Sequence, residues 1–284
     1  MKNSTILLAI AEATPTSDLT NQLEAIRAIP ARVVVLVVGE MPIFPYFAVG
    51  AIPNGAMDIP LEWQDDVMAH NAALKAKAEE IETLLSQHDV SGEVAVVANE
   101  PAMVADAVAR RAMLCDMAWI SDDLRQSNAL FRQTIYGVLF QSPIGVVLND
   151  HDLAVLRGPK RVFVAWNTHL SSASAVHQTL TILRQADEVI IGTVDPEMSQ
   201  YREGEDPGVD VANWLTHHGC NVVVQQYPSG GQDIADCLLQ RAKEVGADLI
   251  VMGAYGHSRM RETIFGGTTR AMIEQGDQAV YLAH

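Results

Sequence analysis

The chain has 284 residues, enough for one large domain or for two ordinary domains that each bury a core. Hydrophobic residues make up 49% of the sequence and charged residues 19%, a balance typical of a globular protein. The formal net charge of −16 excludes a broad basic surface, so it argues against nucleic-acid partners and against binding to anionic membranes.

Neither a membrane span nor a secretory leader is expected. The longest apolar runs, such as Val33–Val38, are far shorter than the ~20 residues of a membrane helix. The stretch Ile6–Ala11 is shorter than a secretory h-region and is better explained as a first strand. Cys115, Cys220 and Cys237 lack metal-ligand spacing and are expected as core or helix residues in a reducing compartment. We therefore expect a cytoplasmic protein.

Apolar strands alternate with helical segments along the chain. The first half predicts strands at Thr5–Ala11, Arg32–Val38, Gly92–Ala98, Asp116–Ser121 and Pro143–Leu148. The second half predicts strands at Arg161–Trp166, Glu188–Val194, Asn221–Tyr227, Asp248–Met252 and Ala279–Ala283, with helices at Ser171–Gln185, Val209–His218, Asp233–Val245 and Thr268–Gln275. This alternation predicts α/β architecture in two tandem doubly wound domains, each a five-stranded, mostly parallel sheet flanked by helices.

The two halves repeat one plan. Arg132–Gly137 echoes Arg261–Gly266, and such pairs lie about 130 residues apart, whereas upstream pairs such as Ile6 and Val162 lie about 156 apart. The first half therefore carries an insertion at about 40–66, between its second and third strands. We place an N-terminal domain at 1–150 and a C-terminal domain at 158–284. The insertion combines Pro, Gly and aromatic residues over Met41–Gly55, so we expect a cover over the domain, a lid or an interface.

A glycine-rich segment follows the apolar run Asp248–Val251. It contains Gly253 and Gly256, then Gly266 and Gly267 after nine further residues, and it leads into the last predicted helix. A buried strand, a glycine-rich turn and a helix start can hold phosphates, because backbone N–H groups and the helix dipole favour an anion. The alternative is a purely structural turn, in which the glycines serve positive φ or close packing.

At these glycines the sequence resembles the universal stress protein family. Nucleotide-binding members carry Gly-x₂-Gly-x₉-Gly followed directly by Ser or Thr. Here Gly267 takes that place, and the hydroxyls follow at Thr268 and Thr269. The resemblance covers nearly the whole chain, and it implies the adenine-nucleotide-binding, Rossmann-like fold of that family, present twice.

The resemblance also implies a set of binding residues in the second half. Asn167 stands where nucleotide-binding relatives have an Asp near the ribose and adenine. Val194 stands where the backbone of such relatives faces the adenine, and the alternative is that Val194 is an ordinary strand residue. These residues would bind ATP or another adenine nucleotide together with Mg²⁺. The alternative is that they bind no ligand. The complete expected set is Asn167, Val194, Met252, Gly253, Gly256, His257, Gly266, Gly267, Thr268 and Thr269.

The first half departs from this pattern. It has Ser121, Asp122, Asp123 and Leu124 where the second half has its first two glycines. Two adjacent carboxylates repel a phosphate, and residues other than glycine restrict the turn. We expect this half to be a degenerate partner.

Catalytic and metal-binding residues are not expected. Ser229–Asp233 resembles the pyrophosphate loop of ATP pyrophosphatases, but it follows the third strand of its half and continues with Ile234, so we expect a turn and a helix cap. The histidines lack metal-ligand spacing, and neither a Gly-x-Ser-x-Gly elbow nor a Walker Gly-Lys-Ser/Thr motif occurs.

Three functions remain open. The resemblance favours a universal stress protein, a stress-response binding or regulatory module without catalysis or with weak catalysis, acting on unknown protein clients. The alternatives are a nucleotide-free interaction protein of the same fold, and a slow ATPase or adenylating enzyme. We expect the halves to pack as an intrachain pseudo-dimer through Pro143–Leu148 and Ala279–Ala283, with a homodimer also possible.

Overall fold

The structure is a computed structural model, and it describes residues 3–45, 59–199, 206–254 and 266–284. Strand and helix alternate through both halves, as the sequence predicts. The first half contains β1 (Ser4–Ala11), α1 (Thr16–Arg27), β2 (Ala31–Glu40), α2 (Leu61–Gln87), β3 (Gly92–Asn99), α3 (Pro101–Ala112), β4 (Met117–Ile120), α4 (Asn128–Gln141) and β5 (Val146–Leu148). The second contains β6 (Arg161–Ala165), α5 (Leu170–Leu183), β7 (Glu188–Val194), α6 (Val209–His217), β8 (Val222–Tyr227), α7 (Ile234–Glu244), β9 (Leu249–Gly253), α8 (Gly267–Glu274) and β10 (Val280–Ala283). Two short 3-10 helices lie at Asp122–Gln126 and Ala154–Arg157.

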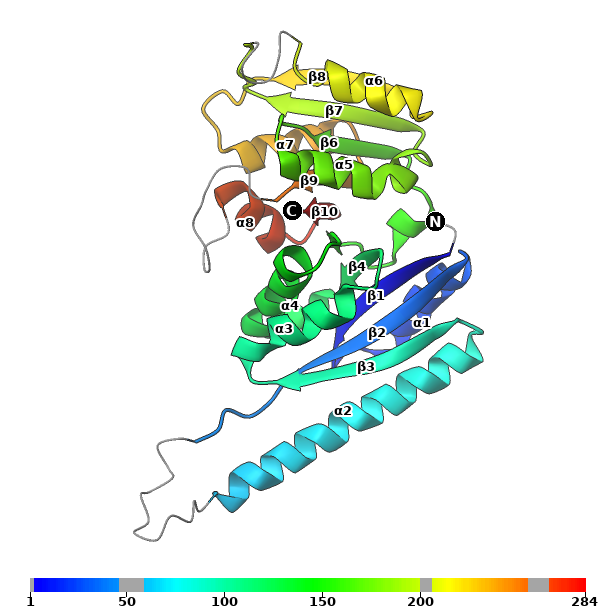
Figure 1. The fold of residues 1–284 in the computed structure, drawn as a ribbon, viewed down its shortest axis with the longest axis vertical. Coiled ribbons are helices and arrows are strands. Elements are labelled where there is room, and N and C mark those ends of the chain that lie inside the picture. Colours follow the sequence, from blue (N-terminus) through cyan, green and yellow to red (C-terminus); the bar gives the residue numbers. More distant parts are fainter. Residues whose placement is uncertain (1–2, 46–58, 200–205, 255–265) are drawn as a thin grey trace.

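All ten strands join in one sheet, in the order β3-β2-β1-β4-β5-β10-β9-β6-β7-β8. Within each half every strand pair is parallel, and the two halves have the same internal order. Figure 1 shows the two halves stacked along the long axis of the molecule. The predicted class, an α/β protein with a mostly parallel sheet flanked by helices, is confirmed.

The strands are apolar along their whole length because both faces of the sheet are covered. In β1, Ile6, Leu8 and Ile10 face one core, whereas Leu7 and Ala9 face the other. The first core also contains side chains of α1, α2, α5 and α6, and the second contains side chains of α3, α4, α7 and α8. Each half therefore contributes two helices to each layer.

The halves join where β5 and β10 pair antiparallel, with Val147 opposite Tyr281. The predicted contact between these two edges is confirmed. Tyr281 is fully buried, and its hydroxyl donates to Gln178 Oε1 at 2.6 Å. Gly145 has no room for a side chain, because a Cβ there would lie 2.6 Å from Leu282 O and closer still to the Tyr281 ring. The junction thus depends on close packing as well as on ladder hydrogen bonds.

A polar network ties the linker after β5 to the end of α8. The Arg125 guanidinium donates to Ile273 O at 2.8 Å and to Asn149 Oδ1 at 2.6 Å. Asn149, which adopts φ 60°, donates through Nδ2 to Gln275 O at 3.0 Å. These bonds satisfy carbonyls at the C-terminal end of α8, which would otherwise lack partners.

The insertion of the first half leads into a long helix. α2 spans 27 residues, whereas its counterpart α6 spans nine. The buried residues of α2 begin only at Leu74, so the first turns of α2 extend past the core, as Figure 1 shows beside β3. Trp63 packs edge-on against Phe44 at 5.0 Å and donates to Pro42 O at 3.2 Å. The rest of the segment expected as a cover, 46–58, lies outside the described residues.

Two smaller expectations were tested as well. Cys115, Cys220 and Cys237 are buried and form no disulfide. In the part of the chain that the structure describes, no helix combines the length and the apolar character needed to span a membrane.

Candidate functional site

The carboxyl ends of β6, β7 and β9 lie together at one edge of the second half. Ala165 in β6 is paired with Gly192 in β7 and with Met252 in β9. β6 is the first strand of its half, and the chain reaches its two neighbours by crossovers on opposite sides. Ligands of open α/β sheets bind in the crevice at such a switch point. The expected residues Asn167, Val194, Met252 and Gly253 all belong to these strand ends.

Asn167 follows β6 and is already engaged through one of its atoms. Its Oδ1 accepts the hydroxyl of Ser172, in the first turn of α5, at 2.5 Å. Its Nδ2 has no hydrogen-bond partner among the described residues. The side chain therefore offers a donor where the Asp of nucleotide-binding relatives would offer only acceptors. Ser172 is a neighbour that the sequence pattern did not reveal.

Val194 ends β7 opposite Tyr227 and is half-buried against the core. The next residue, Asp195, adopts φ 45°, and its carboxylate accepts the Ser229 N–H at 3.0 Å. Hydrogen bonding from Ser229 lowers the pKa of Asp195. This contact ties the end of β7 to the loop that follows β8.

That loop is the segment that resembles a pyrophosphate loop. Gly230 and Gly231 adopt φ 64° and 86°, and Gly231 N–H donates to Ser229 Oγ at 3.2 Å. The predicted turn is confirmed. Asp233 occupies the N-cap position of α7, as expected for a helix cap, but its side chain makes no capping hydrogen bond.

Gly253 ends β9 where the first turn of α5 approaches most closely. A Cβ at Gly253 would lie 2.5 Å from the Ser171 carbonyl carbon and closer still to Ser172 N. Close packing therefore explains why this residue is glycine, because only glycine lets the backbone of α5 come so near to the end of β9. Met252, one residue earlier, is buried in the core, so its side chain is not open to a ligand.

The start of α8 has the opposite character. Gly266 is its N-cap residue, with φ −55°, and no side chain of the described residues caps the helix. Among the described residues, which do not include 255–265, a Cβ at Gly266 or Gly267 would meet nothing within 4 Å. The first N–H groups of α8 have no intrahelical partner, as at any helix start, and such groups are suited to an anion.

The two threonines of α8 differ in exposure. Thr268 is half-buried, whereas Thr269 is only 3% exposed. We expected both hydroxyls to lie close to a phosphate, but the Thr269 side chain faces the core. Gly266 adopts φ −55°, so this position does not require glycine for a positive φ. Gly256 and His257 lie outside the described residues.

The corresponding edge of the first half is acidic. Ser121 caps the 3-10 helix at Asp122–Gln126, and its hydroxyl donates to Asp123 Oδ2 at 3.0 Å. Asp122 forms an ion pair with Arg125 at 2.8 Å, and its other carboxylate oxygen lies 2.7 Å from His151 Nδ1. The carboxylates thus stand where the second half has its glycines, and they offer an anion no N–H cradle.

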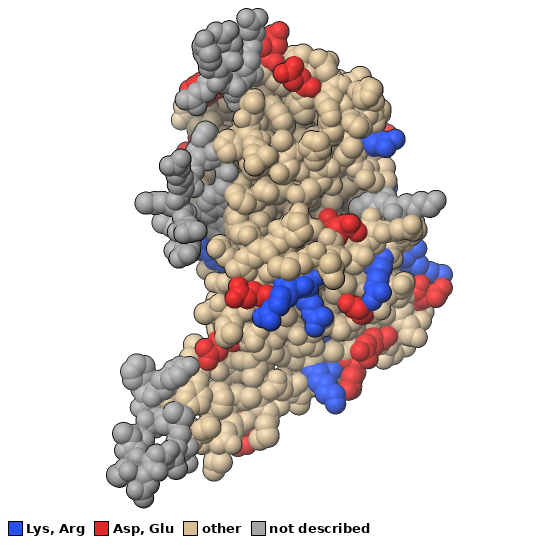
Figure 2. All heavy atoms as spheres, viewed as in Figure 1, with Lys and Arg blue, Asp and Glu red and all other residues tan. Residues whose placement is uncertain are grey.

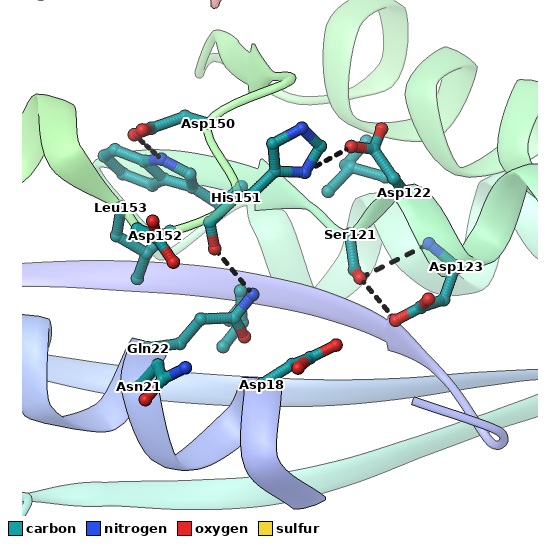
Figure 3. A pocket seen from close by; sticks show the side chains of 13 residues that line it. Asp18, Asn21, Gln22, Ser121, Asp122, Asp123, Asp150, His151, Asp152 and Leu153 are labelled. Atoms are coloured by element: carbon teal, nitrogen blue, oxygen red, sulfur yellow. Dashed lines mark hydrogen bonds and ion pairs between the residues drawn. The ribbon is translucent and has the colours of Figure 1, made fainter. Parts of the chain in front are cut away.

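Beside these carboxylates lies a cavity of about 300 Å³ between α1, the end of β4 and the linker after β5. Figure 3 shows acidic side chains around it: Asp18 from α1, Asp122 and Asp123 after β4, and Asp150 and Asp152 from the linker. Sequence reasoning found only the pair after β4. The other members come from segments far apart in the chain, and no spacing rule connects them.

Asp150 forms the back of this cavity. Its carboxylate accepts the indole N–H of the buried Trp119 at 3.0 Å and the backbone N–H of Ala154 at 2.8 Å. Burial raises the pKa of Asp150 against these hydrogen bonds, which lower it. Asp150 therefore has a structural role, since it anchors the linker to β4.

The fold and this edge define a doubly wound α/β protein built from two similar halves, with its open helix start in the second. Residues 159–284 match the family model described as the universal stress protein family. The C-terminal half of the chain is a universal stress protein domain. No curated protein matches the sequence.

Solved structures share the fold over the whole length. A universal stress protein from Archaeoglobus fulgidus DSM 4304 matches with a TM-score of 0.62 at 15% identity, covering 100% of this chain and 99% of that one. A protein from Pseudomonas aeruginosa UCBPP-PA14, provisionally named a universal stress protein, matches with a TM-score of 0.55 at 13% identity, covering 99% and 93%. The tandem arrangement of the chain is therefore a fold that universal stress proteins adopt.

Proposed function

We propose that this chain is a non-catalytic binding and regulatory module that holds an adenine nucleotide at the carboxyl edge of its C-terminal half. The observation that carries the proposal is the start of α8. Among the described residues, no side chain caps its N–H groups and none comes within 4 Å of a Cβ at Gly266 or Gly267. Such a terminus stabilises a negative charge through its free donors and its dipole.

The adenosine would lie across the ends of β6 and β7. Asn167 Nδ2 is available to donate to a ribose or adenine acceptor. Phosphates would extend toward Gly266, Gly267 and the half-buried Thr268. This arrangement uses backbone groups, so the acidity of the whole chain does not oppose it.

Mg²⁺ would be held mainly by the phosphates and water. Among the described residues no three His, Cys, Asp or Glu side chains converge on one point. Asp195, the carboxylate at the end of β7, already accepts the Ser229 N–H. Mg²⁺ usually keeps several waters and binds through substrate phosphates, so it needs no protein cage.

A second candidate is a nucleotide-free interaction protein of the same fold. Three observations favour it: Asn167 Oδ1 is occupied by Ser172, Gly267 has no hydroxyl, and Gly253 has a packing reason to be glycine. The two candidates differ in one measurable property, which is the affinity of the second half for a nucleotide.

Gly266→Asp tests the nucleotide proposal with little risk to the fold. Asp is a preferred N-cap residue, and no described residue comes within 4 Å of a Cβ at this position. Its carboxylate would take the N–H groups that a phosphate needs and would repel the phosphate. Gly266→Asn is the matched control, because Asn also caps but carries no charge. We expect isothermal titration to show ATP binding to the wild type, weaker binding to the Asn variant and none to the Asp variant.

Other outcomes identify the competing explanations. Equal ATP affinity in the wild type and Gly266→Asp would place the ligand elsewhere. If the wild type binds no nucleotide, and mass spectrometry finds none released from the denatured protein, the nucleotide-free candidate is correct. Asn167→Asp is expected to strengthen binding by restoring an acceptor for a ribose hydroxyl, provided that it still accepts Ser172.

A further inference from the structure

A small groove crosses the junction of the halves, between α4 of the first half and α8 of the second. Its volume is about 180 Å³, and Arg125, Arg132 and Arg270 are among the residues that line it. The chain as a whole has 35 acidic residues and only 19 lysines and arginines. On the face drawn in Figure 2, acidic and basic side chains are interspersed, and neither sign forms a broad patch. Three guanidinium groups around one small groove therefore reverse the charge of the chain locally.

Arg125 forms the fixed part of this groove. Its guanidinium pairs with Asp122 at 2.8 Å and donates to Ile273 O at 2.8 Å and to Gln275 O at 3.2 Å. The guanidinium carbon also lies 4.2 Å from the centre of the Phe131 ring. These contacts hold the cation in one place. They also occupy carbonyls at the C-terminal end of α8 that would otherwise repel an anion.

Arg270 and Asn128 carry donors that the described residues leave unused. Arg270 Nε donates to Glu274 Oε1 at 2.7 Å, whereas its two Nη groups have no hydrogen-bond partner among the described residues. Asn128 is the first residue of α4, and its side-chain amide likewise has no partner in the described ranges. The Arg270 side chain is 56% exposed and Asn128 is exposed, so a ligand in the groove can reach these N–H groups.

The remaining walls also suit an anion. Phe131 and Ile273, which line the groove, are buried and apolar, so they offer no competing acceptor side chain. The stretch from Asn128 to Arg132 forms the start of α4, and the N-terminal end of a helix carries a partial positive charge. The groove is smaller than the roughly 300–1,000 Å³ of sites for drug-sized molecules, so it holds a small ion and not a whole nucleotide.

We propose that this groove binds a small oxyanion with the size and charge of phosphate. The Nη groups of Arg270 and the amide of Asn128 donate to its oxygens, and Arg125 and Arg132 add positive charge. Guanidinium groups bind phosphate oxygens through short, charge-assisted hydrogen bonds. The lining includes one helix from each half, so the bound anion would connect the halves across their junction.

Isothermal titration of the full chain in a zwitterionic buffer tests this proposal, with inorganic phosphate as the probe. Sulfate has the same shape and charge, acetate is a monoanion with two oxygens, and chloride has charge without directed acceptors. We expect saturable binding of phosphate and sulfate, and at least about tenfold weaker binding of acetate and chloride, since these make fewer charge-assisted hydrogen bonds. Methyl phosphate separates two sources of the same chemistry, because tighter binding than phosphate identifies a phosphate ester and weaker binding identifies the free ion.

Two variants connect the anion to the groove with opposite signs, and a third controls for charge. Arg270→Gln removes the free donors and should weaken phosphate at least about tenfold, the order of one charge-assisted hydrogen bond. Glu274→Gln removes the carboxylate that competes for Arg270 and should strengthen phosphate about threefold. Arg32→Gln breaks an equally exposed pair, with Glu93 on neighbouring strands, and should change nothing.

Several results would overturn the proposal. These are no phosphate binding at millimolar concentration, equal binding of chloride, equal losses in Arg270→Gln and Arg32→Gln, or weaker binding in Glu274→Gln. Gly266→Asn separates this site from the nucleotide site, because it caps the start of α8 without adding charge. Phosphate affinity should be unchanged in that variant, and a loss there without a loss in Arg270→Gln would place the anion at the start of α8. Circular dichroism checks folding, which none of these exposed side chains supports through the core.

Discussion

Gly253→Ala should separate α5 from the end of β9 and destabilise the second half. The new Cβ would lie 2.5 Å from the Ser171 carbonyl carbon, where ordinary contact begins near 3.4 Å. The obstructing atoms belong to the backbone of a helix, so no side-chain rotation relieves the clash. α5 or β9 would have to move by about 0.9 Å, and such overpacking typically costs about 1–3 kcal/mol.

The assay is urea or guanidinium unfolding followed by far-UV circular dichroism. We expect a lower midpoint for Gly253→Ala at an unchanged slope, because the surface exposed on unfolding stays the same. Gly267→Ala is the matched control in the same segment. Gly267 lies in α8, and no described residue comes within 4 Å of a Cβ there, so the added methyl should leave stability unchanged or raise it by up to about 1 kcal/mol. Wild-type stability in Gly253→Ala would refute the packing explanation for this glycine.

Two further predictions concern the junction and the α1–α2 contact. Gly145→Ala should cost about 1–3 kcal/mol, because its Cβ would meet the buried Tyr281 ring, and unchanged denaturant unfolding would contradict this. Hydrogen bonds from Thr16 and from Lys77 lower the pKa of Glu80. Glu80 therefore stabilises the fold above its unfolded pKa, and this contribution is lost as pH falls through the lower folded pKa. Glu80 is 36% exposed, so Glu80→Gln should cost less than about 1 kcal/mol at pH 7, with a difference that disappears in acid. A pH-independent difference in unfolding free energy would contradict that assignment.

The sequence by itself determined the alternation of elements. Strands such as Val33–Val38 are continuous apolar runs because helices cover both faces, and helices such as Ile234–Glu244 carry one apolar stripe. Both patterns are local in the chain, so periodicity finds them without knowledge of the partners. The repeat between the halves similarly indicated that Val146–Leu148 and Val280–Ala283 occupy equivalent edges, and these edges pair.

The character of each site residue was decided only by tertiary structure. Gly253 and Gly266 look alike in the sequence, yet a helix backbone requires glycine at Gly253, whereas no described residue comes within 4 Å of a Cβ at Gly266. Asn167 has its acceptor filled by Ser172, and Gln22 meets the linker 129 residues away. The Gly253 and Gln22 contacts join segments remote in the chain, and residue spacing along one strand or helix carries no record of the distance between such segments.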